Sequence, residues 1–207
     1  MFITFEGPEG AGKSLQVRLL AHRLRALGRL VLETREPGGT PLGDQLRHLL
    51  LVRDDLKTVA RAEALMMCAA RAQLVQMVIT PALQRQEIVI CDRFGDSTLA
   101  YQGYGRGVDL EHLRAVLDFA TAGLEPDMTF LLDLPVAAGL ARKEVQSTAA
   151  WTRFEAETLA FHERIREGYL ALARAAPHRW VCLDAQQPPD HLADDIWQRV
   201  SRKLGIG

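Results

Sequence analysis

Hydrophobic residues concentrate in five short runs along the chain. The runs cover residues 1–5, 30–32, 87–91, 128–132 and 180–183. Within each run the apolar side chains follow one another, without the alternation that marks a sheet with one solvated face. Continuous apolar runs are typical of parallel strands that are covered on both faces. The pattern therefore predicts a buried, five-stranded parallel sheet.

The longer segments between these runs carry apolar residues at helical spacing. This spacing predicts helices over about residues 15–27, 60–85, 113–120, 159–172 and 192–204. Gly28 and Gly123 end two of them, and Pro81 disturbs a late turn of the second. Strands that alternate with helices favour an α/β fold, here a three-layer sandwich with right-handed crossovers.

One segment breaks this alternation. Residues 143–156 are polar and lack strong periodicity, which predicts a mobile loop between two helices. The chain has no internal repeat, low-complexity stretch or linker that would mark a boundary. A length of 207 residues then favours a single domain over residues 1–207.

The composition narrows the class of protein. Hydrophobic residues make up 48% and charged residues 25%, as in soluble globular proteins. The 25 Lys and Arg nearly cancel the 26 Asp and Glu, so we expect no basic face and no nucleic-acid partner. The longest apolar stretches are short and interrupted, and the first residues form no positively charged leader. We therefore expect no membrane span and a cytoplasmic location.

The cysteines and histidines carry no sign of a metal centre. Cys68, Cys91 and Cys182 are widely spaced and set among apolar neighbours. That setting favours buried, reduced thiols over disulfides or a zinc site. The six histidines show no metal-ligand spacing, and we interpret them as structural or surface residues.

The strongest chemical signal follows the first strand. The pattern G-x-x-x-x-G-K-[ST], between a strand and a helix, is matched by Gly7, Pro8, Glu9, Gly10, Ala11, Gly12, Lys13 and Ser14. Such glycines let backbone N–H groups surround phosphate oxygens, and the following helix adds its positive end. Lys13 is expected to bridge the β- and γ-phosphates, and Ser14 to bind Mg²⁺. The segment therefore predicts a nucleoside triphosphate site.

A phosphate loop alone does not separate kinases from GTPase switches, ATPases or motor domains. Residues 92–95 even fit the D-x-x-G pattern of the switches. However, the chain contains no Asn-Lys-x-Asp motif that would read guanine. A binding-only switch would also leave several arginines without a role.

Those arginines indicate a second, anionic substrate. Asp92 and Arg93 follow the third strand and Arg35 follows the second, so all should lie at the ligand-binding edge of the sheet. Arginine binds phosphate in a bidentate manner. Arg71 stands in a small, apolar part of a helix, which suggests a pocket. Each position also has a structural alternative. These are a helix cap with a surface ion pair for Asp92 and Arg93, an ordinary turn after Arg35, and a snorkelling side chain for Arg71.

Further candidates come from the loop after the third strand and from the mobile loop. Ser97, Tyr101 and Gln102 are placed to line a sugar and base pocket, although loop residues of this kind often lie on the surface. Arg142 and Arg153 flank the mobile loop. An arginine swung over transferring phosphates stabilises the charge of the transition state, whereas a solvated position is the common alternative.

Four segments together resemble bacterial thymidylate kinases, of the nucleoside-monophosphate kinase family of P-loop kinases. They are residues 6–14, 35–40, 69–73 and 92–103, and the likeness extends to residues 183–185. The resemblance implies a P-loop kinase fold whose mobile lid spans about residues 142–156. It also implies phosphoryl transfer from Mg·ATP to dTMP, giving ADP and dTDP for dTTP synthesis, by a homodimer.

The resemblance also implies roles for residues on the acceptor side. Glu9 would lie near the substrate 3′-hydroxyl, and Arg35 would hold the dTMP phosphate. Arg71 would read the thymine edge, and Tyr101 and Gln102 would lie near the deoxyribose and the base.

On the phosphoryl-transfer side, the resemblance gives Asp92 a role in organising Mg²⁺ and substrate. Arg93 would contact the phosphate that is attacked, and Gln186 falls in the stretch beside adenine. Gly10 stands where some relatives carry an arginine in the phosphate loop. The similarity to loops that lack it assigns the catalytic arginine to the lid, as Arg142 or Arg153.

Two departures from the family pattern affect the expected site. The lid has Thr152-Arg153 where Asp-Arg is usual, and it lacks the usual Arg-Gly pair. Met67 stands where an aromatic residue would stack on thymine, and a thioether packs on a ring with looser geometry. We therefore hypothesise that base selectivity is relaxed.

The leading hypothesis is a dTMP kinase that uses ATP and Mg²⁺. Another nucleoside-monophosphate or deoxynucleoside kinase of the same fold is the alternative among enzymes. From a different class, a nucleotide-dependent switch or binding protein remains open.

Overall fold

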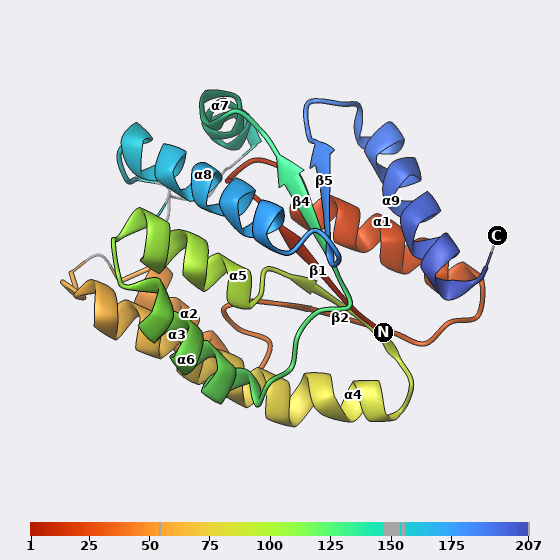
Figure 1. Ribbon diagram of the computed structural model, residues 1–207, viewed down its shortest axis with the longest axis horizontal. Coiled ribbons are helices and arrows are strands. Elements are labelled where there is room, and N and C mark those ends of the chain that lie inside the picture. Colours follow the sequence, from red (N-terminus) through yellow and green to blue (C-terminus); the bar gives the residue numbers. More distant parts are fainter. Residues whose placement is uncertain (54, 147–153, 155, 207) are drawn as a thin grey trace.

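The predicted parallel sheet forms the centre of the molecule (Figure 1). A computed structural model describes residues 1–53, 55–146, 154 and 156–206. The strands run in the order β2-β3-β1-β4-β5 and all neighbours pair in parallel. Their bounds are β1 Phe2–Glu6, β2 Val31–Arg35, β3 Ile88–Asp92, β4 Met128–Asp133 and β5 Trp180–Asp184. The fold class is confirmed as α/β with a five-stranded parallel sheet.

Helices cover both faces of this sheet, which makes three layers (Figure 1). On one face, Ile3 and Phe5 of β1 pack with α1 (Lys13–Ala26) and α9 (Pro189–Leu204). On the other face, the side chains belong to α3 (Ala60–Leu74), α6 (Leu110–Thr121) and α8 (Leu159–Ala175). Because parallel strands alternate their side chains between the two faces, both faces need an apolar cover. This explains the continuous apolar runs in the sequence.

Three further helical segments were missed by the sequence analysis. They are α2 (Pro41–Leu51), α5 with the π-helical segment η2 (Gly95–Thr98 and Leu99–Gly105) and α7 (Val136–Gln146). The first has a clear start signal, because Thr40 accepts the N–H of Gly43 and Pro41 follows it. Residues 143–146 of the predicted loop belong to α7, so that loop was predicted to begin too early.

The long predicted helix is continuous but changes its hydrogen bonding before Pro81. It consists of α3, the π-helical segment η1 (Val75–Ile79) and α4 (Thr80–Gln84). The N–H of Thr80 donates to the carbonyl of Val75, five residues back. A widened turn of this kind accommodates the proline ring, which would otherwise collide with the preceding turn.

The same run, Ala60–Gln84, is the one described helical stretch long and apolar enough to cross a membrane by composition. The sequence analysis overlooked it because it counted only uninterrupted apolar runs. However, 44% of the relevant window is buried inside the protein. Core helices of soluble proteins pass the same test, so the composition is weak support for a span.

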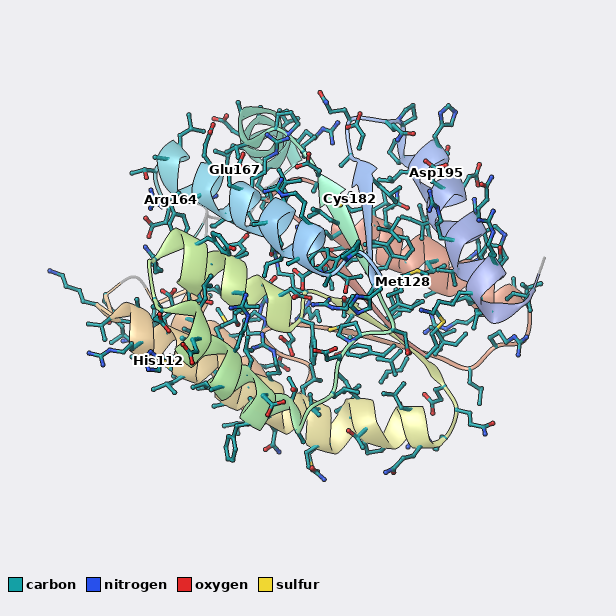
Figure 2. All side chains as sticks on the ribbon, in the orientation of Figure 1. His112, Met128, Arg164, Glu167, Cys182 and Asp195 are labelled. Carbon is teal, nitrogen blue, oxygen red and sulfur yellow. The ribbon has the colours of Figure 1, made fainter. Side chains whose placement is uncertain are left out.

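Cys182 corrects the expectation of three buried thiols. Cys68 and Cys91 are buried, whereas Cys182 is exposed. The reason is its position on β5, the last strand of the sheet order (Figure 2). There it borders a small cavity that Leu170 also lines. Burial along β5 is accordingly less complete than along β1, where every residue is buried.

The backbone of helix α7 closely approaches the backbone of the phosphate loop. A Cβ atom added to Gly139 would overlap the carbonyl oxygen of Glu9, and one added to Gly10 would overlap the carbonyl of Gly139. Gly10 also has a φ of 71°, which disfavours any L side chain. The absence of side chains at these two positions therefore sets how closely α7 approaches the loop.

We predict that Gly139→Ala lowers the melting temperature by several degrees. Helix propensity alone favours alanine by about 1 kcal/mol, but overlap with the Glu9 carbonyl should cost about 1–3 kcal/mol. Gly95→Ala is the matched control, because its added Cβ meets only Leu117 at an ordinary 3.6 Å. Thermal unfolding followed by circular dichroism measures both. A Gly139→Ala protein at least as stable as the parent would show that the contact is not restrictive.

Candidate active site

A cavity of ≈ 450 Å³ opens at the carboxyl edge of the sheet, next to the phosphate loop. The loop follows β1, and the sheet order places β3 and β4 on its two sides. Such an edge is the usual ligand site of open α/β sheets. The polar and charged side chains that line the cavity are Glu9, Lys13, Ser14, Arg18, Arg35, Glu36, Arg47, Arg71, Asp92, Arg93, Ser97, Thr98, Tyr101, Gln102 and Lys143.

Lys13 is held inside the phosphate loop. Its Nζ donates to the carbonyls of Gly7 at 3.0 Å and of Pro8 at 2.7 Å, and the residue is buried. Burial, followed by the charge of Arg93, lowers its pKa to about 8, against the opposing effect of Glu9. A buried ammonium group with two carbonyl partners is ready to exchange one of them for a phosphate oxygen.

Ser14 and Asp92 meet beside Lys13. The hydroxyl of Ser14 donates to Oδ2 of Asp92, and both residues line the cavity. Hydroxyl and carboxylate oxygens suit Mg²⁺, which takes few ligands from the protein and the rest from water and substrate phosphates. The described residues contain no cluster of three His, Cys, Asp or Glu that would form a full protein cage. The donor set thus fits a nucleotide-bound Mg²⁺.

Arg93 connects the phosphate loop to helix α8. Its Nη1 donates to the carbonyl of Gly7 at 3.1 Å and the hydroxyl of Tyr169 at 2.9 Å, and its Nη2 to Glu9 at 2.9 Å. Its Cζ lies 5.0 Å from the centre of the Tyr101 ring. Burial opposes its charge, yet the surrounding tyrosine and glutamate side chains raise its pKa well above the usual value. Arg93 is therefore a fixed, permanent cation at the cavity.

Glu9 remains ionised although it is half-buried. Burial raises its pKa, but Arg93, Lys13 and the Tyr101 hydroxyl, which donates to Oε1 at 2.6 Å, lower the pKa to about 2. The charge of Lys143 adds a smaller effect in the same direction. The cavity thus presents a carboxylate oriented by an arginine and a phenol.

Three of the five arginines that line the cavity, Arg35, Arg47 and Arg93, form one group of charges. Arg35 ends β2, Arg93 follows β3, and Arg47 donates from α2 to the carbonyl of Pro37 at 2.9 Å. Burial, followed by the charges of Arg35 and Arg93, lowers the pKa of Arg47. The carboxylates of Asp92 and Asp44 act in the opposite direction, and a bound anion would relieve the remaining repulsion between the arginines. The cluster therefore marks an anion site.

Arg71 is buried and oriented by several partners. Its Nε and Nη2 both contact Oε2 of Glu36, at 2.7 Å and 2.6 Å. Nη1 donates to Thr98 at 3.1 Å and Nη2 to the carbonyl of Phe94 at 3.2 Å. Burial raises the pKa of Glu36 despite Arg71, and its Oε1 has no partner among the described residues. A polar atom without a partner at a cavity wall is available to a ligand.

Most candidates from the sequence meet in this cavity. Of the expected phosphate-loop residues, Gly10, Gly12 and those named above line it, whereas Gly7, Pro8 and Ala11 do not contribute to its wall. The other candidates on its wall are Arg35, Met67, Arg71, Asp92, Arg93, Ser97, Tyr101 and Gln102.

Two candidates lie elsewhere and one lies outside the described residues. Arg142 does not line the cavity; its Nη1 donates to the carbonyl of Ala185 at 2.9 Å. Gln186 is next to Ala185 and lines a smaller cavity of ≈ 240 Å³. Arg142 therefore lies beside the stretch expected to contact adenine. Arg153 falls outside the described residues.

The sequence analysis missed several residues of the cavity. Arg18 follows Ser14 by four residues on α1, so helical spacing alone places it on the same face. Arg47 was missed because α2 was not recognised. Glu36 acts as a partner of Arg71, and only the tertiary structure reveals such a pair.

Behind the cavity lies Glu6, a buried carboxyl group at the end of β1. It accepts the backbone N–H of Phe94 at 2.7 Å and the hydroxyls of Ser97 at 2.6 Å and Tyr169 at 3.0 Å. Burial, followed by the charge of Asp96, raises its pKa to about 7, although Arg93 and the hydrogen bonds oppose this. Ser97 and Tyr169 also accept from Arg93, so Glu6 supports that arginine indirectly.

This pKa predicts a pH-dependent stability. The ordinary pKa is 4.5 and the folded value is about 7, so between them the folded chain keeps a proton that the unfolded chain releases. The free energy of unfolding therefore falls as the pH rises from 4.5 to about 7, and it does not fall further above that pH. Glu6→Gln should remove this loss. The free energy of unfolding of the variant, relative to that of the parent, should therefore rise by about 2 kcal/mol between pH 5 and pH 8. Denaturant unfolding at pH 5, 6.5 and 8 measures it, and a pH-independent difference would contradict the prediction.

Comparisons with known proteins agree with this geometry. A family model described as "Thymidylate kinase" matches residues 5–196. The chain is 52% identical over 206 residues to the thymidylate kinase of Thermomicrobium roseum, covering 100% of this chain and 97% of the relative. To that of Desulfovibrio desulfuricans it is 52% identical over 198 residues, covering 92% and 90%. The crystal structure of thymidylate kinase from Ehrlichia chaffeensis matches with a TM-score of 0.73 at 36% identity, covering 88% and 91%. The chain belongs to the thymidylate kinase family.

Proposed function

We propose that the cavity transfers the γ-phosphoryl group of ATP to dTMP, giving ADP and dTDP. The observation that carries the proposal is the convergence of Arg35, Arg47 and Arg93 in the cavity of the phosphate loop. A protein that only binds a nucleoside triphosphate has no need for a second group of cations. The family match likewise disfavours a switch protein and a kinase for other nucleotides.

On the donor side, the phosphate loop and Lys13 bind the ATP phosphates. Phosphoryl transfer depends on positioning and charge neutralisation, and fixed donors in a buried site supply both without reorganisation. Ser14 and Asp92 would hold Mg²⁺, which neutralises charge on the bridged phosphates when bound. Arg142 and Gln186 lie together where the family resemblance expects adenine.

On the acceptor side, Arg35 and Arg47 hold the phosphate of dTMP. Arg93 reaches the space between the ATP phosphates and the dTMP phosphate. It donates to the carbonyl of Gly7 in the phosphate loop, and it is near enough to Arg47 for its charge to lower the pKa of that arginine. Glu9 and Tyr101 contact the deoxyribose, while Arg71, Met67 and Gln102 surround the base. The loose packing expected of Met67 motivates the hypothesis of relaxed base selectivity.

The organisation of the enzyme follows the same proposal. We take residues 1–207 as one kinase domain with a lid over about residues 142–156. Of that lid, residues 142–146, 154 and 156 are described, and Phe154 lines the cavity. Either Arg142 or Arg153 would complete the charge neutralisation from the lid. The buried, free thiols of Cys68 and Cys91 suit a reducing cytoplasm.

A coupled ADP-release assay tests the reaction. It uses Mg·ATP with dTMP, dUMP, dCMP, dGMP, AMP and thymidine, and we expect the highest turnover with dTMP. Fastest turnover of another monophosphate would retain the mechanism but change the substrate. No turnover across the panel, with ATP still bound, would contradict the kinase.

Arg47 provides a direct test of the acceptor-phosphate site. We predict that Arg47→Ala raises the KM for dTMP about ten- to hundredfold and leaves ATP binding unchanged, because a hydrogen bond to a charged group contributes about 1.5–3 kcal/mol. Arg199→Ala, an exposed arginine on α9, is the control. Steady-state kinetics with each substrate varied measure the effect. An unchanged KM for dTMP would remove Arg47 from the site.

We also propose a homodimer. Helix α3 packs against both α2 and α6, and each of these three helices exposes a large apolar side chain. The exposed fractions are 50% for Leu42 on α2, 57% for Leu65 on α3 and 89% for Phe119 on α6. Exposed apolar groups of this size are typical of interaction surfaces.

Mass measurement in solution tests the dimer. The parent should have twice the mass of the 23.0 kDa chain. The double variant Leu65→Asp, Phe119→Asp should be monomeric, because each carboxylate would lose its hydration in the interface. Leu27→Asp, exposed by 55% at the end of α1, is the control and should remain dimeric. A parent of monomer mass would overturn the proposal.

A further inference from the structure

One buried carboxylate near the cavity has no role in the proposed reaction. Glu63 lies in the first turn of α3 and is 1% exposed. It precedes Met67 and Arg71 by four and eight residues, so all three share one stripe of the helix. Met67 and Arg71 line the cavity, whereas Glu63 does not. Burial of a carboxylate is unfavourable without partners, which raises the question of what Glu63 binds.

Its partners connect it to the base side of the cavity. Gln102 lines the cavity and donates through Nε2 to Oε1 of Glu63 at 2.8 Å. Nε of Arg106 is 3.5 Å from the same oxygen. Arg106 is itself held by Glu157 at 2.6 Å, and its Cζ lies 4.5 Å from the centre of the Phe161 ring. Glu63 is therefore a fixed acceptor directly behind Gln102.

This contact determines which way the Gln102 amide faces. An amide group has a donor end and an acceptor end, whereas a carboxylate only accepts. The nitrogen of Gln102 must therefore face Glu63, and its carbonyl oxygen is left as the acceptor for a bound base. Because Gln102 is 1% exposed, water offers little competition for either end.

An acceptor at this position distinguishes between pyrimidines. Thymine and uracil carry an N3–H donor beside the O4 acceptor, whereas cytosine has an N3 acceptor beside an N4 amino donor. A Gln102 oxygen matches N3–H and repels the lone pair of cytosine N3. Arg71, which can only donate, likewise matches O4 and repels the amino group. A site of this kind rejects a mismatched partner because polar groups are left unpaired.

We propose that Glu63 is a specificity-determining positioning residue, which holds the carbonyl oxygen of Gln102 toward the base and so excludes cytosine nucleotides. The inference rests on the proposed function in one respect, the placement of the base beside Gln102. It assigns no role to Glu63 in distinguishing dTMP from dUMP, because thymine and uracil share the same hydrogen-bonding edge.

Glu63→Gln is the principal test. The new side chain can donate to Gln102 and so allows its amide to turn over. The ratio of kcat/KM for dTMP to kcat/KM for dCMP should fall at least about tenfold, because one polar contact has an effect of about this size on discrimination. The corresponding ratio of dTMP to dUMP should stay within about twofold of the parent value. Glu157→Gln is the matched control, because it also removes a carboxylate from Arg106 but does not contact Gln102. It should change neither ratio.

Further variants separate the possible outcomes. If Glu63→Gln does not fold, as judged by its thermal transition, Glu63→Asp takes its place; its shorter acceptor should lower the dTMP to dCMP ratio by a smaller factor. Gln102→Leu tests the underlying placement of the base. If Gln102→Leu changes the dTMP to dCMP ratio and the Glu63 variants do not, the role of Glu63 is overturned and the placement of the base stands. No change with Gln102→Leu would show instead that the base lies elsewhere.

Discussion

The cavity depends on one half-buried cation, Arg93. Its backbone adopts a φ of 71°, a left-handed conformation that costs a non-glycine residue about 1 kcal/mol. The hydrogen bond from the N–H of Phe94 to Glu6 and the contacts of the Arg93 guanidinium with Glu9 and Tyr169 offset this strain. Helix α8, the phosphate loop and the end of β3 are thereby joined at a single side chain. The position of the Arg93 side chain is thus set by this network of contacts rather than by any one loop.

Much of the fold was predictable from local sequence. The five strands lie where continuous apolar runs predicted them, because both faces of a parallel sheet are covered. The helices around residues 41–51 and 95–105 were missed for different reasons. The first has a recognisable cap at Thr40 that was not used. The second contains glycines and a π-helical turn, and its stability comes from packing against α8 rather than from propensity.

The residues of the candidate site likewise fall into those that the sequence predicted and those that it did not. Many residues that line the cavity come in motifs, and Lys13, Asp92 and Arg93 were found because they follow strands that end at one edge. Residues that act through another side chain leave no such pattern. Glu36 and Glu63 are far from their partners in sequence, and only the fold brings each to its arginine or glutamine. The exposure of Cys182 was missed because an apolar run does not reveal which strand lies at the edge.

The backbone contact between Gly10 and Gly139 has an evolutionary consequence. Position 10 is where an arginine in the phosphate loop would enter, and a side chain there overlaps helix α7. An ancestor could not gain that arginine by one substitution without losing stability. If the catalytic arginine lies in the lid, as proposed, a change to an arginine at position 10 therefore requires coupled changes in the loop and in α7.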